Sequence, residues 1–136
     1  MNKPLISHVG IAVKDLEKAI KTYSIVTGDK SPVIDEVGSD NVKVAIFTNA
    51  NNSGGRVELV SATSEESPIA RFIKKRGEGL HHICIYVDDV DKKLAELKKA
   101  GVKLIDEKCR IGAEGKKIAF VHPENFNGVL LELEEK

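Results

Sequence analysis

The sequence predicts an α+β fold in which two tandem βαβββ modules form a cupped, barrel-like mixed sheet with helices outside. Two pairs of chemically matched residues support this prediction, because both recur at one offset: His8 with His82, and Glu58 with Glu132, each 74 positions apart. Longer segments recur at the same offset, and strand and helix patterns follow one order in both halves. Two copies at so long a period indicate a duplicated half-domain rather than a solenoid.

The first half of the chain is predicted to form a strand, a helix and three more strands. Residues 5–13 alternate in polarity and are rich in Val and Ile, which is typical of a strand. Asp15 is a good N-cap for an amphipathic helix that ends near Gly28. Turn-rich segments then separate three further strands. We expect these strands at 31–37, 42–48 and 56–61.

The second half repeats this order after a connecting helix. A short amphipathic pattern at 67–76, with Pro68 in its first turn, predicts that helix. Residues 80–87 predict a strand, and Asp89 caps a helix that Gly101 ends. Three more strands complete the module. We expect them at 102–107, 116–121 and 128–134.

The length of 136 residues fits one domain with a sizeable core. We expect residues 1–136 to form one domain, with module 1 at about 5–63, the linker helix at about 67–76 and module 2 at about 79–136.

The composition excludes some classes of partner. Lys+Arg and Asp+Glu are both 21, so no global charge favours nucleic acid or a membrane surface. No apolar run approaches the length of a membrane span, and the first residues lack the apolar region of a signal peptide. Two cysteines do not make a disulfide framework, so we expect the protein to reside in the reducing cytoplasm.

Strand alternation indicates that the repeated histidines face a cavity. Successive strand residues point to opposite faces, which places His8 with Gly10 and Ala12 and leaves larger apolar residues on the other face. The larger residues are therefore expected to pack against the helix. The face that carries the histidine is lined by small side chains and leaves space. His82 shares its face with Cys84 in the same way.

The two glutamates each lie between apolar neighbours, on the same kind of face. A buried ionised carboxylate is costly unless it is paired or binds a metal. Imidazole and carboxylate ligands together suit Zn, Fe, Ni, Co or Mn. We therefore predict a metal site formed by His8, Glu58, His82 and Glu132. An octahedral ion held by these four would keep two open positions for a bidentate oxygen ligand.

Simpler interpretations apply to each of these residues on its own. A lone histidine in a strand is usually a structural residue, and a lone glutamate usually lies on the solvent face of a sheet. Glu132 and Glu134 could form an exposed stripe near the C-terminus. A repeat can also preserve a fold without preserving a metal. The matched offsets favour the metal site over these alternatives.

The chain resembles the vicinal oxygen chelate (glyoxalase/bleomycin resistance/dioxygenase) superfamily, and within it the methylmalonyl-CoA epimerase family. Four motifs carry the resemblance, which covers essentially the whole chain. They are Glu66–Phe72 (ESPIARF), Gly77–Ile83 (GEGLHHI), Ile118–Pro123 (IAFVHP) and Gly128–Leu133 (GVLLEL).

The resemblance implies a metal-dependent epimerase that interconverts (R)- and (S)-methylmalonyl-CoA by removing the α-proton. It implies one divalent ion (Co, Mn, Ni or Zn), a CoA-thioester substrate and a homodimer. It also implies that Glu132 is a catalytic base as well as a ligand. One alternative is glyoxalase I, lactoylglutathione lyase, which acts on the methylglyoxal–glutathione hemithioacetal. A second alternative is a non-catalytic small-molecule binding or resistance protein of the same fold.

The second acid or base departs from the family pattern. The family places a glutamate on the third strand of the first module, where this chain has residues 43–47 and no acid. The repeat offers Glu58 instead, as the symmetric partner of Glu132. In the family the second histidine of the HH pair is the ligand, and the offset independently selects His82 over His81. We expect His81 to face the opposite side or the rim.

Basic residues outside the repeat are candidates for contacts with CoA phosphates. These are Lys116, Lys117 and Arg76, together with Lys74 and Lys75. Most exposed basic residues are simply solvated, and this is the alternative for each of them. His122 is assigned to the turn with Pro123.

Overall fold

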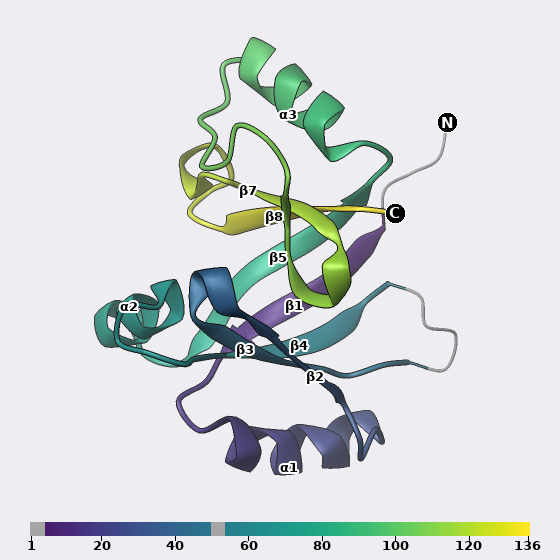
Figure 1. Cartoon of the computed structure of the whole chain (residues 1–136), viewed down its shortest axis with the longest axis vertical. Coiled ribbons are helices and arrows are strands. Elements are labelled where there is room, and N and C mark those ends of the chain that lie inside the picture. The colour runs from purple at the N-terminus through teal and green to yellow at the C-terminus, as the bar shows by residue number, and fades with distance from the viewer. Residues whose placement is uncertain (1–4, 50–53) are drawn as a thin grey trace.

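The protein forms one curled, eight-stranded mixed sheet with three helices, which confirms the predicted α+β fold (Figure 1). The structure, a computed structural model, describes residues 5–49 and 54–136. The strands lie in the order β2-β3-β4-β1-β5-β8-β7-β6. Their bounds are β1 Ile6–Ala12, β2 Val33–Val37, β3 Val42–Ile46, β4 Arg56–Ala62, β5 Gly79–Val87, β6 Arg110–Ile111, β7 Lys117–Val121 and β8 Leu130–Glu135.

The two halves meet at the centre of the sheet, where β1 pairs with β5 in antiparallel orientation. Each of these central strands has a parallel neighbour from its own half, β4 beside β1 and β8 beside β5. The registers obey the repeat, because Gly10 lies opposite Glu58 and Cys84 lies opposite Glu132. All four predicted ligands therefore lie on the four central strands.

The helices begin and end where the sequence predicts. Helix α1 (Leu16–Thr27) is capped by the Asp15 carboxylate, and Gly28 ends it in the left-handed conformation. Helix α3 (Val90–Lys99) is capped by Asp89. The connecting helix α2 (Pro68–Arg76) begins after Ser67, whose hydroxyl accepts from the next turn.

Apolar side chains divide between the two faces of the sheet as the strand alternation predicts. Val13, Phe47 and Leu59 pack with α1 on the outer face of the first half. Val90 and Leu94 of α3 pack on the outer face of the second half. Figure 1 shows α1 and α3 at opposite ends of the molecule, outside the curl, with α2 beside the central strands. The inner face is thus left for the cavity.

The prediction of a strand at 102–107 is wrong. This segment runs beside β7 but makes only one isolated bridge, Leu104 with Val121. The Asp106 side chain accepts the backbone N–H of Phe120 at 2.8 Å, so a carboxylate takes the place of a main-chain carbonyl and interrupts the ladder. The short strand β6 forms later, at Arg110–Ile111. The other predicted strands agree with the structure within two residues at each end.

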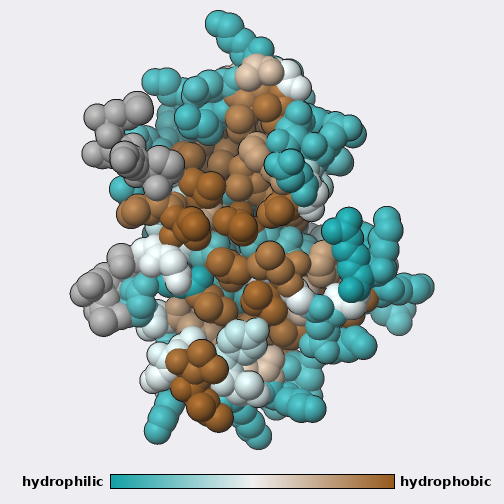
Figure 2. Space-filling view, turned by 180° about the vertical axis from the view of Figure 1, so that it is seen from behind, coloured by the Kyte–Doolittle hydropathy of each residue, from teal (hydrophilic) through white to brown (hydrophobic). Residues whose placement is uncertain are grey.

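Apolar side chains gather in a band across the middle of the back of the molecule (Figure 2). Exposed large apolar residues of the described chain include Leu5 and Ile6 at the start of β1, and Ile25 and Val26 on α1. Surface of this kind is often covered by a partner, and the homodimer stays a prediction. Within the described ranges, none of the helices has the length and apolar character that a membrane crossing requires.

Candidate metal centre

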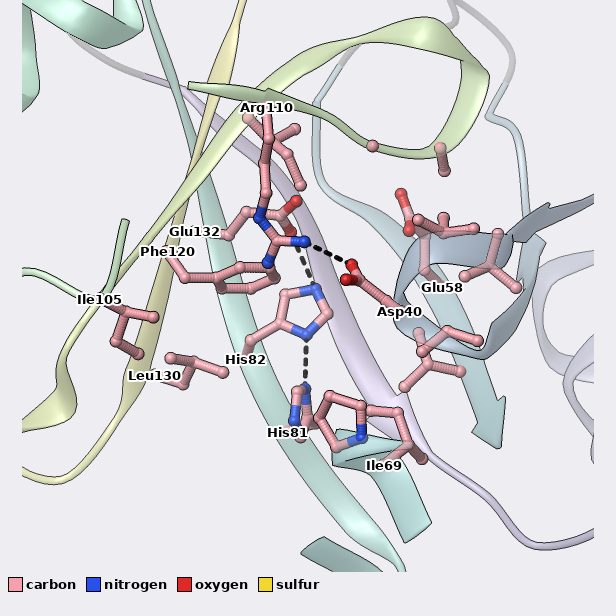
Figure 3. A pocket seen from close by; sticks show the side chains of 18 of the residues that line it. Asp40, Glu58, Ile69, His81, His82, Ile105, Arg110, Phe120, Leu130 and Glu132 are labelled. Carbon is pink, nitrogen blue, oxygen red and sulfur yellow. Dashed lines mark hydrogen bonds and ion pairs between the residues drawn. The ribbon is translucent and has the colours of Figure 1, made fainter. Parts of the chain in front are cut away.

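A cavity of about 340 Å³ occupies the inner face of the sheet and is lined by both halves of the chain. Val44, Glu58 and Val60 line it from the first half, and His82 and Glu132 line it from the second. Figure 3 shows the labelled side chains of the two halves facing each other across this space. Apolar walls with a few convergent ionisable groups are typical of a small-molecule site.

Both central strands carry a β-bulge immediately before their predicted ligand. In β1 the pairing with β5 skips Ser7, and in β5 it skips His81. These two residues are themselves 74 positions apart. A bulge leaves one residue unpaired and breaks the alternation of side chains. The strict alternation assumed from the sequence therefore fails at these two points, and it fails identically in both modules.

Three of the four predicted ligands converge on one point. His8 Nε2 lies 3.1 Å from His82 Nε2 and 3.1 Å from Glu132 Oε1, and His82 Nε2 lies 3.1 Å from the same carboxylate oxygen. All three side chains are buried. Donor atoms at such separations can each lie about 2.1 Å from a single ion, the length of a metal bond to imidazole or carboxylate.

Glu58 lies at the other edge of the His8 ring. Its Oε2 is 3.0 Å from His8 Nδ1, whereas the three convergent donors involve His8 Nε2. The expectation that all four donors meet at one point is therefore met by three of them. An unscreened carboxylate is drawn to the nearest proton donor, and Nδ1 provides one. Glu58 also lines the cavity, and its carboxylate would have to leave His8 Nδ1 to join the other three donors.

Gly10 provides the space that the His82 ring fills. A Cβ placed on Gly10 would overlap the His82 ring. Only glycine fits here, which explains why a small residue follows His8 on the inner face.

We predict that Gly10→Ala displaces His82 and destabilises the fold by about 1–3 kcal/mol, the usual cost of overpacking. Denaturant unfolding measures the loss of stability, and metal titration measures the loss of affinity. Gly38→Ala is the matched control, because nothing lies within 4 Å of a Cβ at Gly38. Equal behaviour of the two variants would contradict the prediction.

The charges of the cluster depend on one another. Burial alone would lower the pKa of His8, but hydrogen bonds and charges from Glu132 and Glu58 outweigh burial and raise it to about 10. Burial alone would raise the pKa of Glu132, but hydrogen bonds and charges from His8 and His82 lower it to about 2. Without metal, the cluster is therefore an imidazolium between carboxylates at neutral pH.

These shifts predict how the stability of the metal-free protein varies with pH. A raised pKa stabilises the fold below the unfolded value of 6.5, and this contribution is lost as the pH rises through about 10. The lowered pKa of Glu132 stabilises the fold above 4.5, and that contribution is lost as the pH falls through about 2. Thermal unfolding of chelator-treated protein should therefore show a decline in midpoint between pH 7 and 10. His8→Gln should flatten this decline, and an unchanged profile in that variant would contradict the assignment.

His81 lines the cavity and also the adjacent one, which excludes the opposite side, the first of its two expected placements. The bulge turns it to the same face as His82, and its Nδ1 lies 2.9 Å from His82 Nδ1 (Figure 3). Burial first, and then the charge of His82, lower the pKa of His81 to about 4, so the ring is neutral. A neutral ring can accept the His82 Nδ1–H and direct His82 Nε2 towards the cluster.

A charged pair that the sequence does not predict, Arg110 with Asp40, spans the cavity between the two halves. Arg110 donates to Asp40 at 2.5 Å and to Asp106 at 3.1 Å, and its guanidinium lies over the Phe120 ring at 5.2 Å. Figure 3 shows Arg110 and Asp40 meeting above His82. No periodicity marks either residue, because both lie in short irregular elements of the chain. Their pairing depends on how the sheet curls.

The basic residues predicted to contact substrate lie outside this cavity. Lys117 precedes Ile118, which lines the cavity, so its side chain points to the other face, where it pairs with Glu135 at 3.7 Å. Lys116 is exposed and is not among the lining residues. Arg76 instead lines an adjacent cavity of about 360 Å³. His122 caps the turn with Pro123, as expected, by accepting from the Glu124 N–H.

A family model described as the Glyoxalase/Bleomycin resistance protein/Dioxygenase superfamily matches residues 7–120. The chain belongs to this superfamily. It is 39% identical to the mitochondrial methylmalonyl-CoA epimerase of Homo sapiens over 96% of this chain and 73% of that one. It is 38% identical to the ethylmalonyl-CoA/methylmalonyl-CoA epimerase of Cereibacter sphaeroides, over 96% of both chains.

A solved structure of methylmalonyl-CoA epimerase in complex with methylmalonyl-CoA and NH4+ superposes with a TM-score of 0.89. It shares 29% identity and covers 99% of this chain and 96% of that chain. The superfamily fold and the resemblance to its epimerases are thus confirmed over nearly all of the chain. On the third strand this member presents Val44 to the cavity and no acid, as residues 43–47 predict.

Proposed function

We propose that this chain is a methylmalonyl-CoA epimerase, which interconverts (R)- and (S)-methylmalonyl-CoA with the help of one divalent metal ion. The observation that carries the proposal is the convergence of His8, His82 and Glu132 on one point at the wall of a buried cavity. The named epimerases among its relatives support the substrate class.

The residues present suit a divalent ion. Two imidazole nitrogens and a carboxylate oxygen are the mixed donors that Zn, Co, Ni and Mn accept. Here the three donor atoms are buried close together. We assign His8, His82 and Glu132 as ligands and Glu58 as the fourth, after it turns from His8 Nδ1. An ion held there supplies a Lewis acid that withdraws electrons from the substrate carbonyl.

Epimerisation requires removal of the α-proton on one face and its return on the other. We assign Glu132 as the base on one face, because its carboxylate lines the cavity beside the two histidines and the resemblance gives it this role. We assign Glu58 to the opposite face, because it approaches the cavity from β4 in the other half of the chain. The third strand presents Val44 to the cavity and no acid. Asp40 also lines the cavity but is paired with Arg110, so we assign the second role to Glu58.

The two cavities together suit an acyl-CoA. The adjacent cavity shares His81, Ile105 and Leu130 with the first, so a substrate with its acyl end near His82 can extend past His81. Arg76 lies on the lining of this second cavity and can meet a phosphate there.

We predict that Arg76→Ala raises the KM for the CoA thioester about tenfold with little change in kcat, because a phosphate contact acts equally on substrate and transition state. Lys117→Ala is the matched control and should leave both constants unchanged. Steady-state kinetics with methylmalonyl-CoA measure the effect. A larger effect from Lys117 than from Arg76 would overturn this placement of the CoA arm.

The experiment that tests the function compares two substrates on the metal-loaded protein. Epimerisation of methylmalonyl-CoA without turnover of the methylglyoxal–glutathione hemithioacetal supports the proposal. The reverse result would identify glyoxalase I chemistry. Tight binding of either compound with no turnover would identify a non-catalytic binding protein.

Three further predictions accompany this proposal. Because both modules contribute to one sheet and one site, we propose that residues 1–136 act as one domain. A homodimer and a cytoplasmic location stay predictions. Sedimentation velocity tests the homodimer, and localisation of a tagged chain tests the cytoplasmic location.

A further inference from the structure

The hydroxyl of Ser7 lies directly behind the predicted ligand His8. The bulge in β1 brings Ser7 Oγ to 2.9 Å from His8 Nδ1, although the two residues are neighbours in a strand. Ser7 Oγ donates to Glu134 Oε1 at 3.1 Å. Ser7 and Glu134 are 0% and 4% exposed, so no solvent competes for these contacts.

The polarity of this chain of contacts fixes the proton on His8. The single hydroxyl proton of Ser7 is used towards Glu134, so only its lone pairs remain for His8. Nδ1 must then be the donor to Ser7. A neutral His8 with its proton on Nδ1 presents the lone pair of Nε2 to His82 and Glu132, which is the form that binds a metal.

Packing alone does not require an ionisable side chain at the buried position of Glu134. Its counterpart 74 positions earlier is Val60, a buried apolar residue in β4. The fold of the module therefore accepts an aliphatic side chain here. Glu134 Oε1 also lies 3.8 Å from His8 Nδ1 and 3.9 Å from Cys84 Sγ, while Oε2 has no partner among the described residues. Burying a carboxylate costs free energy, so we expect its role to lie in its contacts with Ser7 and His8.

Glu58 and Ser7 compete for the same proton. Glu58 Oε2 is 3.0 Å from His8 Nδ1, and it must leave that position to become the fourth ligand. Its departure would leave the N–H of His8 without a carboxylate at hydrogen-bond distance, since Glu134 Oε1 lies 3.8 Å away. Ser7, held by Glu134, is the acceptor already in place for that moment.

We propose that Ser7 and Glu134 form a positioning relay that takes over His8 Nδ1 when Glu58 turns to the metal. The relay holds the ring and its tautomer, and neither residue touches the substrate. This inference rests on the proposed metal site and extends it beyond the four ligands. Outer contacts of this kind usually change metal affinity by about 10- to 100-fold.

The test measures the affinity of the chelator-treated full chain for Co²⁺, by competition with a coloured chelator, together with the visible spectrum of the cobalt form. Ser7→Ala should weaken binding by about 10- to 100-fold and alter the cobalt bands. Glu134→Val copies the residue of the first module and should weaken binding similarly. Because both act through one relay, the double variant should be no weaker than either single variant.

Ser61→Ala is the matched control. Ser61 is also a buried strand serine, and its hydroxyl contacts the Lys43 carbonyl instead of a histidine. It should bind Co²⁺ like the unaltered chain. Unchanged affinity in both Ser7→Ala and Glu134→Val, or losses that add in the double variant, would overturn the relay. Failure of the unaltered chain to bind Co²⁺ would overturn the metal site itself, and the relay with it.

Discussion

Glu132→Gln should reduce methylmalonyl-CoA epimerisation by about 10³-fold or more. The substitution removes a general base, which contributes about 10²- to 10⁴-fold, and it also replaces a charged ligand by a neutral amide. Glu132 Oε1 lies 3.1 Å from both His8 Nε2 and His82 Nε2. Loss of its charge therefore affects the proton transfer and the metal together.

Chiral analysis of the product, with metal content measured on the same sample, checks this prediction. Glu135→Gln is the matched control, because Glu135 is at the end of the same strand and pairs with Lys117. Epimerisation by Glu132→Gln at the unaltered rate, with metal bound, would show that Glu132 is not a base.

Glu58→Gln should separate proton exchange from inversion. An amide oxygen can still bind the ion, so we expect metal binding to persist, while proton transfer on that face falls by about 10²-fold. One epimer should then exchange its α-proton with solvent through Glu132 without being inverted. The ratio of exchange to inversion, followed by NMR in deuterated solvent, should rise above that of the unaltered chain.

Glu58→Ala provides the comparison for the ligand role, because alanine removes both functions. We expect it to lose metal affinity, which Glu58→Gln keeps. If Glu58→Gln inverts the substrate at the unaltered rate, the second proton donor lies elsewhere in the cavity. Asp40, which also lines the cavity, would then be the next acid to replace.

Much of the fold could be predicted because the repeat is visible in the residues themselves. Helix caps such as Asp15 and Asp89 and the alternation in β1 are local signals, and local structure obeys them. The segment 102–107 has the same apolar pattern as a strand. The Asp106 side chain overrides that pattern by accepting the N–H of Phe120, which no periodicity reveals.

The site was predictable as a set of residues and less so as an arrangement. The offset identified His8, His82 and Glu132, which do converge. It could not show that bulges at Ser7 and His81 turn these residues towards the ligands, since a bulge depends on pairing between strands. Arg110 and Asp40 meet only because the sheet curls, so their contact has no signature in the sequence.

The central claim is that this chain moves the α-proton of methylmalonyl-CoA with a metal held by His8, His82 and Glu132. The most direct measurement is α-proton exchange in deuterated water, comparing the chelator-treated chain, the same chain with Co²⁺ restored, and His82→Ala with Co²⁺. We predict exchange and inversion only in the restored chain. Equal exchange in the chelator-treated chain, or in His82→Ala, would contradict the claim.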